Sequence, residues 1–157
     1  MSTAAEAPIL IGLGNPLRGD DGAGLELARM VASRAPWARV AGHEGEPTGL
    51  IELWEGASLA IVADAAAAAG EPGRVRRAVA GGGKLPFRPA AAASTHAIDL
   101  GGVIELAGTL ERLPHRLVVY GIEGERFGVG EALSPRVGAA LGPLAETVLA
   151  ELRDARG

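Results

Sequence analysis

Cysteine is absent from the 157-residue chain. Its absence excludes disulfide bonds, catalysis by a thiolate, and zinc or iron–sulfur sites that are built from cysteine. Nothing in the sequence indicates an oxidising compartment. Any metal site would therefore use nitrogen and oxygen ligands, from histidine and carboxylate side chains.

Aromatic residues are few, and no apolar run is long. With two tryptophans, two phenylalanines and one tyrosine, the core would consist of Ile, Leu, Val and Ala, which suits helices packed on a sheet. No segment approaches the ~20 apolar residues that a membrane span needs. Residues 1–8 lack the basic and apolar regions of a secretory signal. We expect a soluble, cytoplasmic protein with no membrane partner.

Basic residues are outnumbered by acidic ones, 15 against 19, so the formal net charge is −4. Proteins that bind nucleic acid through its phosphates normally have a basic stripe on their surface. The nearest feature of this kind, formed by Arg74, Arg76 and Arg77, is too short for that function. We expect no nucleic-acid partner. The length fits a single domain, residues 1–157, because no repeat or linker divides it.

Strand and helix patterns alternate along the chain. Short apolar runs predict strands at 9–13, 39–41, 59–63 and 117–120, and a weak alternation predicts an outer strand at 75–80. This alternation with helices is typical of α/β proteins. The sequence therefore predicts a three-layer α/β/α fold, in which helices cover both faces of a mostly parallel sheet.

Four helices are expected between these strands. They would begin near Asp20 or Asp21, at Pro47, after His96, and at Ser134, which can cap the closing helix ahead of Pro135. The first helix should end before Pro36. Two apolar faces are predicted by spacing: Leu25, Ala28, Val31 and Ala32 on the first helix, and Ile98, Val103, Leu106 and Leu110 on the third.

Acidic residues follow two of the predicted strands. Asp20 and Asp21 come after the turn that ends the first strand, and Asp64 ends the third. Ligands of open α/β sheets bind at the carboxyl ends of the strands, and neighbouring strands lie about 4.8 Å apart, so these carboxylates can converge. His96 follows the Gly- and Pro-rich stretch 81–93 and can reach the same edge. Two carboxylates and an imidazole suit a divalent transition metal and leave coordination positions open.

Each of these residues also has an ordinary structural explanation. Asp20 would cap a helix, Asp21 would be an acid in its first turn, and Asp64 would start a turn. A single histidine such as His96 is more often a hydrogen-bonded polar residue than a metal ligand. The other histidines are expected to be structural or surface residues: His43 and His115.

The turn at residues 12–17 begins like a dinucleotide-binding fingerprint. Leu17, however, stands where the third glycine should be. Asp20 and Asp21 would also place negative charge beside the phosphates. The sequence therefore disfavours a nucleotide site.

Residues 12–24, GLGNPLRGDDGAG, resemble the opening signature of the hydrogenase maturation protease family. The resemblance continues in order through four shorter blocks: 61–65 (IVADA), 94–96 (STH), 121–123 (GIE) and 130–137 (GEALSPRV). The first block is long and specific. Together the blocks span nearly the whole chain.

The resemblance implies a sheet of about five strands, a metal site and a reaction. In the family, an acid after the first strand, an aspartate on a central strand and a later histidine hold the metal, and these positions correspond to Asp21, Asp64 and His96. The implied activity is that of an endopeptidase that recognises nickel in a [NiFe]-hydrogenase large-subunit precursor and removes its C-terminal extension. Nickel would arrive with the precursor, and the enzyme would act as a monomer. Metal-assisted hydrolysis is the favoured mechanism, with Asp21 or Asp64 as an alternative general base.

Two departures from the family pattern stand out. The family usually has Asp-Gly-Gly-Thr after the second strand, whereas this chain has residues 44–49, EGEPTG. Glu44, Gly45 and Thr48 are the substrate-binding candidates of this loop. Gly124 replaces a frequent proline, which we expect to alter the stiffness of its loop.

Two other functions compete with the endopeptidase. A non-catalytic chaperone that binds nickel or the precursor would use the same three ligands. A peptidyl-tRNA hydrolase has a similar opening motif, but it requires a histidine soon after that motif and a basic channel. Residues 17–30 contain no histidine, and the net charge is negative.

Overall fold

Five short segments of mostly apolar residues form one sheet in the computed structural model, which describes residues 7–81, 84–90 and 98–156. The strands are β1 (Ile9–Leu13), β2 (Arg39–His43), β3 (Ala60–Ala66), β4 (Val75–Val79) and β5 (Leu117–Glu123). Their order is β2-β1-β3-β5-β4, and only the edge strand β4 runs antiparallel to its neighbour. The predicted mostly parallel sheet is confirmed.

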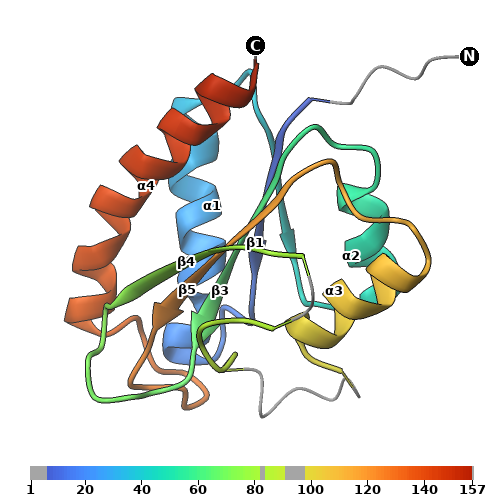
Figure 1. Cartoon of the computed structure of the whole chain (residues 1–157). Helices are drawn as coiled ribbons and strands as arrows, with labels where there is room; N and C mark the ends of the chain where they lie inside the picture. Colours follow the sequence, from blue (N-terminus) through green and yellow to red (C-terminus); the bar gives the residue numbers. More distant parts are fainter. Residues whose placement is uncertain (1–6, 82–83, 91–97, 157) are drawn as a thin grey trace, which may run out of the picture.

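Helices cover both faces of the sheet (Figure 1). A short 3-10 helix, η1 (Gly19–Gly22), leads into α1 (Ala23–Arg34), which lies with α4 (Pro135–Arg156) on one face. The opposite face is covered by α2 (Pro47–Trp54) and α3 (Leu100–Thr109). The three-layer α/β/α architecture is therefore confirmed. Among the described residues, none of the helices is long and apolar enough to cross a bilayer.

The core divides into two apolar clusters because successive side chains of a strand point to opposite faces. On β3, Ile61 and Ala63 pack in the cluster beneath α1 and α4, whereas Ala60 and Val62 pack beneath α2 and α3. Asp64 follows this alternation and therefore belongs to the α2/α3 face. The two faces of the sheet thus have distinct environments, and the Asp64 side chain lies on the α2/α3 face.

The predicted apolar faces of two helices were partly wrong. On α1, Ala32 is exposed and Leu27 is fully buried, so the buried stripe is displaced from the predicted one. On α3, Leu106 and Leu110 are 38% and 50% exposed. The helix begins at Leu100, so the buried stripe is another set with helical spacing: Leu100, Val103, Ile104 and Ala107.

The N-terminus of α1 lies unusually close to the sheet. A Cβ atom on Gly24 would be 2.3 Å from the carbonyl oxygen of Ala63 and 2.7 Å from that of Leu13. Both atoms belong to the backbone, so neither can move aside at low cost. The absence of a side chain at residue 24 therefore lets the first helix sit directly on β1 and β3.

Gly24→Ala should lower the free energy of unfolding by about 2–4 kcal/mol, because the added methyl overlaps backbone atoms of two strands. Gly138→Ala in α4 is the matched control, since a Cβ at that position has no heavy atom within 4 Å. This control should raise the free energy of unfolding by up to about 1 kcal/mol. Denaturant unfolding of the three proteins measures both effects. Equal changes at the two glycines would contradict the close approach.

Candidate active site

Asp21 is held on the turn that leaves β1. Gly14 has a positive φ of 141°, and a Cβ there would lie only 1.8 Å from the carbonyl oxygen of Asp21. The backbone N–H of Asn15 donates a hydrogen bond of 2.9 Å to Oδ2 of Asp21. These contacts fix the half-buried Asp21 carboxylate above the carboxyl end of β1.

Asp64 lies on the neighbouring strand, one residue beyond its pairing with β1. The last β1–β3 pair joins Gly12 to Ala63, whereas β3 continues alongside β5 as far as Ala66. The prediction that the strand ends at Asp64 was therefore wrong, although the pairing with β1 does end there. The Asp64 residue is only 5% exposed.

The two carboxylates lie close enough to influence each other. Burial, which is the largest cause, acts together with the negative charges of Asp21 and, to a lesser degree, Asp99 to raise the pKa of Asp64 from 3.8 to about 7. Burial also raises the pKa of Asp21, although the Asn15 hydrogen bond and the charge of Arg18 oppose this shift. The sheet edge therefore holds a carboxylate pair, Asp21 and Asp64, in which each charge is costly.

Asp99 is a member of this acidic environment that the sequence prediction missed. Its side chain caps α3 by accepting a hydrogen bond of 3.0 Å from the backbone N–H of Gly102. An acid immediately before the apolar run that starts at Leu100 is an N-cap signal. This signal was overlooked because the helix was expected to start directly after His96.

Asp20 has a structural role that differs from the predicted one. It is fully buried, and its carboxylate accepts hydrogen bonds from the backbone N–H groups of Glu125, Arg126 and Ser134 and from the Ser134 hydroxyl. Burial alone would raise the pKa of Asp20, but these hydrogen bonds lower it. Asp20 therefore fastens η1 to the loop between β5 and α4. The Ser134 hydroxyl, expected to cap α4, donates to Asp20 instead.

Gly124 has a more specific role than the predicted change in loop stiffness. Its N–H donates a hydrogen bond of 3.0 Å to the carbonyl of Ala66, which a proline could not form. A Cβ on Gly124 would lie 2.7 Å from Cβ of Asp20. The glycine therefore lets the β5–α4 loop pack against the buried carboxylate.

The third predicted ligand, His96, lies outside the described residues. Within residues 7–81, 84–90 and 98–156, no three histidine, aspartate or glutamate side chains gather in a way that could hold one metal ion. The structure thus brings together Asp21 and Asp64, and the ligand role of His96 stays a prediction.

The substrate-binding candidates lie at the same edge of the sheet, after β2. Because Leu13 pairs with His43, the loop that contains Glu44 and Gly45 starts beside the turn of Asp21, and Thr48 follows it in the first turn of α2. Glu44 and Thr48 are exposed, and Gly45 has a positive φ of 101°. Their role in binding substrate stays a prediction.

Two side chains, those of His43 and Glu46, accept hydrogen bonds from the backbone of this segment. Glu46 caps α2 by accepting hydrogen bonds of 2.9 and 2.7 Å from the N–H groups of Thr48 and Gly49. His43 accepts a hydrogen bond of 2.9 Å from the N–H of Gly45, which confirms its predicted structural role.

Comparison with known proteins matches most of this chain to one protein family. Residues 41–151 match the family described as hydrogenase maturation protease, a region that includes Asp64 and His96 and begins after Asp21. A search of curated proteins gave no match.

Three solved structures illustrate the likeness in fold. The [NiFe] hydrogenase maturation protease HybD from Thermococcus kodakarensis is 23% identical, with 93% of this chain and 99% of that chain covered and a TM-score of 0.71. The hydrogenase maturating endopeptidase HybD from E. coli is 19% identical, with coverages of 95% and 93% and a TM-score of 0.70. The [NiFe] hydrogenase maturation protease HycI from T. kodakarensis is 23% identical, with coverages of 94% and 92% and a TM-score of 0.68. At these identities the structures establish the fold.

Asp64→Asn should stabilise the metal-free protein at high pH. Since the pKa of Asp64 is raised to about 7, the stability that its proton contributes is complete below pH 3.8 and is lost as the pH rises through 7. Asparagine stays neutral, so the variant should gain at least about 1 kcal/mol in free energy of unfolding over the wild type at pH 8 and little at pH 4. Urea unfolding at both pH values measures the difference. The exposed Asp154→Asn is the control, and a gain for Asp64→Asn that is equal at both pH values would contradict the burial of this charge.

Proposed function

This chain belongs to the hydrogenase maturation protease family, and we propose that it removes the C-terminal extension from a [NiFe]-hydrogenase large-subunit precursor. Membership makes it a peptidase of hydrogenase maturation. The relatives from T. kodakarensis are described as [NiFe] hydrogenase maturation proteases, which supports the choice of the nickel–iron enzyme. The family match also disfavours the peptidyl-tRNA hydrolase alternative.

The substrate would be recognised through its nickel. The observation that supports this step is the pair formed by Asp21 and Asp64, which the β1–β3 pairing places at one sheet edge. The buried Asp64 and the half-buried Asp21 carboxylates repel each other, and a divalent cation between them would offset that repulsion. Nickel accepts carboxylate and imidazole ligands, so His96 would complete the set. The metal would enter as part of the precursor and leave with the processed subunit.

The residues of the chain also offer proton transfer for hydrolysis. When nickel is bound, it would polarise the scissile carbonyl or the attacking water. Alternatively, Asp21 or Asp64 would act as the general base, taking a proton from the attacking water and giving it to the amine as the C–N bond breaks. Asp21 is held by the Asn15 N–H and would orient the substrate.

The compartment and the oligomeric state of the enzyme are also proposals. A cysteine-free chain suits a reducing compartment, so we place the enzyme in the cytoplasm. We propose that it acts as a monomer.

A processing assay tests the proposed function directly. Purified protein is incubated with nickel-loaded and nickel-free precursors from the same source, and the product mass is measured. The endopeptidase should shorten only the loaded precursor. Binding without any cleavage would contradict the proposal and would support a nickel- or precursor-binding chaperone.

Variants of the proposed ligands sharpen this assay. Asp21→Asn, Asp64→Asn and His96→Ala should each lower the processing rate at least about a hundredfold, because each removes a metal ligand or a proton acceptor. Each variant should keep a cooperative unfolding transition. Asp154→Asn, which neutralises an exposed carboxylate on α4, should process at the wild-type rate. Loss of folding in all three ligand variants would indicate a structural role.

A further inference from the structure

A basic pocket adjoins the carboxylate pair on the same face of the sheet. The pocket has a volume of about 340 Å³, and its lining includes Ala66 and Gly121. Gly121 is the residue of β5 that pairs with Asp64, and Ala66 is two residues beyond Asp64 on β3. Because side chains alternate along a strand, Ala66 and Asp64 share the α2/α3 face. The pocket therefore lies roughly 7 Å along β3 from Asp64.

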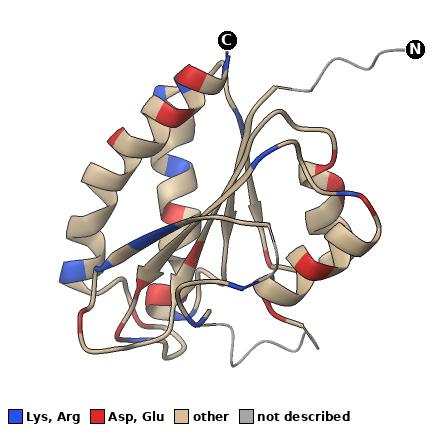
Figure 2. Ribbon diagram, viewed as in Figure 1, with Lys and Arg blue, Asp and Glu red and all other residues tan. Residues whose placement is uncertain are grey.

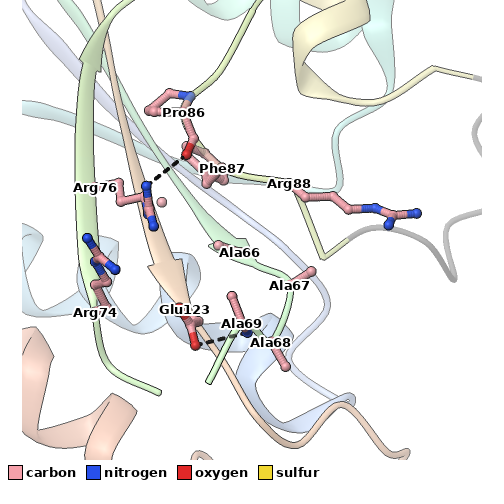
Figure 3. Close-up of a pocket in the computed structure, with 11 residues that line it drawn as sticks. Ala66, Ala67, Ala68, Ala69, Arg74, Arg76, Pro86, Phe87, Arg88 and Glu123 are labelled. Atoms are coloured by element: carbon pink, nitrogen blue, oxygen red, sulfur yellow. Dashed lines mark hydrogen bonds between the residues drawn. The ribbon is translucent and has the colours of Figure 1, made fainter. Parts of the chain in front are cut away.

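Two arginines, Arg76 of β4 and Arg74 just before this strand, form one wall of the pocket. Arg76 pairs with Gly121 in the antiparallel register, and Arg74 lies two residues away, so both side chains belong to the pocket face. Arg77, which lies next to Arg76, points to the other face and forms an ion pair of 2.8 Å with Glu151 of α4. Figure 3 shows Arg76 on β4 and Arg74 just before it, with Arg88 extending outward from the opposite wall.

The guanidinium groups of this wall retain unused hydrogen-bond donors. Arg76 donates one hydrogen bond of 3.2 Å to the carbonyl of Pro86. The side chain of Arg74 is 47% exposed and forms a loose ion pair of 3.6 Å with Glu71. Among the described residues these are their side-chain partners, so N–H groups remain for a ligand.

Acidic residues near the pocket offset only part of its positive charge. Glu123 is the acidic residue of the lining, and its Oε2 atom accepts hydrogen bonds of 3.0 and 2.6 Å from the N–H groups of Ala69 and Glu71. The lining therefore has three arginines against one glutamate, in a chain whose net charge is −4. Figure 2 shows the basic residues of β4 beside the acidic end of β5.

The rest of the lining is apolar and leaves room for a peptide. Residues 66–69 are all alanine, and Phe87 packs over Gly121, where a Cβ would lie 2.5 Å from the ring. A guanidinium wall over a small-residue floor is suited to a peptide segment with a carboxylate, because arginine binds carboxylates through two parallel N–H groups.

We propose that this pocket binds a carboxylate of the C-terminal extension that is cut from the precursor. The inference rests on the proposed function. The sheet order β1-β3-β5-β4 places the nickel-binding pair over β1 and β3 and the pocket over β5 and β4. With the nickel-bearing body at the pair, the chain beyond the scissile bond would run toward the pocket. An extended peptide covers about 3.4 Å per residue, so the bound carboxylate lies about two to four residues beyond the cleaved bond.

Binding of a synthetic peptide with the sequence of the extension tests this proposal. Fluorescence anisotropy measures its Kd for the wild type, Arg74→Glu and Arg76→Gln. Both variants should weaken binding about five- to tenfold. The control is Arg153→Glu, which reverses an exposed charge in the last turn of α4, away from the pocket. Its Kd should stay within twofold of the wild-type value. Thermal unfolding confirms that each variant is folded.

Two altered peptides identify the source of the carboxylate. One has a C-terminal amide, and the other has asparagine and glutamine in place of its acidic residues. The peptide that lacks the bound carboxylate should bind weakly to the wild type and show no further loss with Arg74→Glu. Equal binding of all three peptides, no binding of the natural peptide, or equal losses with Arg74→Glu and Arg153→Glu would overturn the proposal.

Cleavage of the precursor is measured in a separate assay, so that failure of the proposed peptidase function can be distinguished from failure of the proposed pocket. In the processing assay, Arg74→Glu should raise KM about five- to tenfold and leave kcat within twofold of the wild type. A wild-type protein that binds the peptide through Arg74 but cleaves no precursor would refute the peptidase and keep the pocket. Cleavage with an unchanged KM for Arg74→Glu would refute the pocket alone.

Discussion

The parallel pairing of β1 with β3 is the interaction on which the site depends. It ends at Gly12 and Ala63, so the turn after β1 and the next residue of β3 meet at one edge. The first helix reaches that edge because Gly24 has no side chain to collide with the Ala63 and Leu13 carbonyls. Backbone packing therefore brings Asp21 and Asp64 together, even though each carboxylate is destabilised by burial and Asp64 also by the charge of Asp21.

Hydrogen bonds from the surrounding backbone hold the segment that contains this unfavourable pair. Asn15 donates to Asp21, and the buried Asp20 ties η1 to the loop that follows β5. Asp20 thus stabilises the backbone around the site, while Asp21 itself retains hydrogen-bonding capacity. A site that is held by its backbone and left uncompensated in charge is suited to a cation that arrives with a substrate and then leaves.

Much of this could be predicted from the sequence, because the signals are local. Short apolar runs predict the strands, and the rule that ligands bind at strand carboxyl ends selects Asp20, Asp21 and Asp64. The family resemblance then points to Asp21 rather than Asp20. Other features depend on long-range contacts and could not be predicted. Neither the partners of Asp20, more than a hundred residues away, nor the approach of Asp99 to Asp64 has a sequence signature. The group formed by Arg74, Arg76 and Arg77 is too short for a nucleic-acid surface. The antiparallel register of β4 sends Arg76 and Arg77 to opposite faces, and only the folded structure places Arg74 and Arg76 in one pocket beside the site.

The most direct test of a shared site is the titration of the aspartate side-chain carboxyl carbons by NMR in metal-free protein. Asp64 should titrate near pH 7 in the wild type, and its pKa should fall in Asp21→Asn because a neighbouring negative charge is removed. An Asp64 carboxyl that titrates near pH 4, or whose pKa is unchanged by Asp21→Asn, would show that the two carboxylates do not form one site.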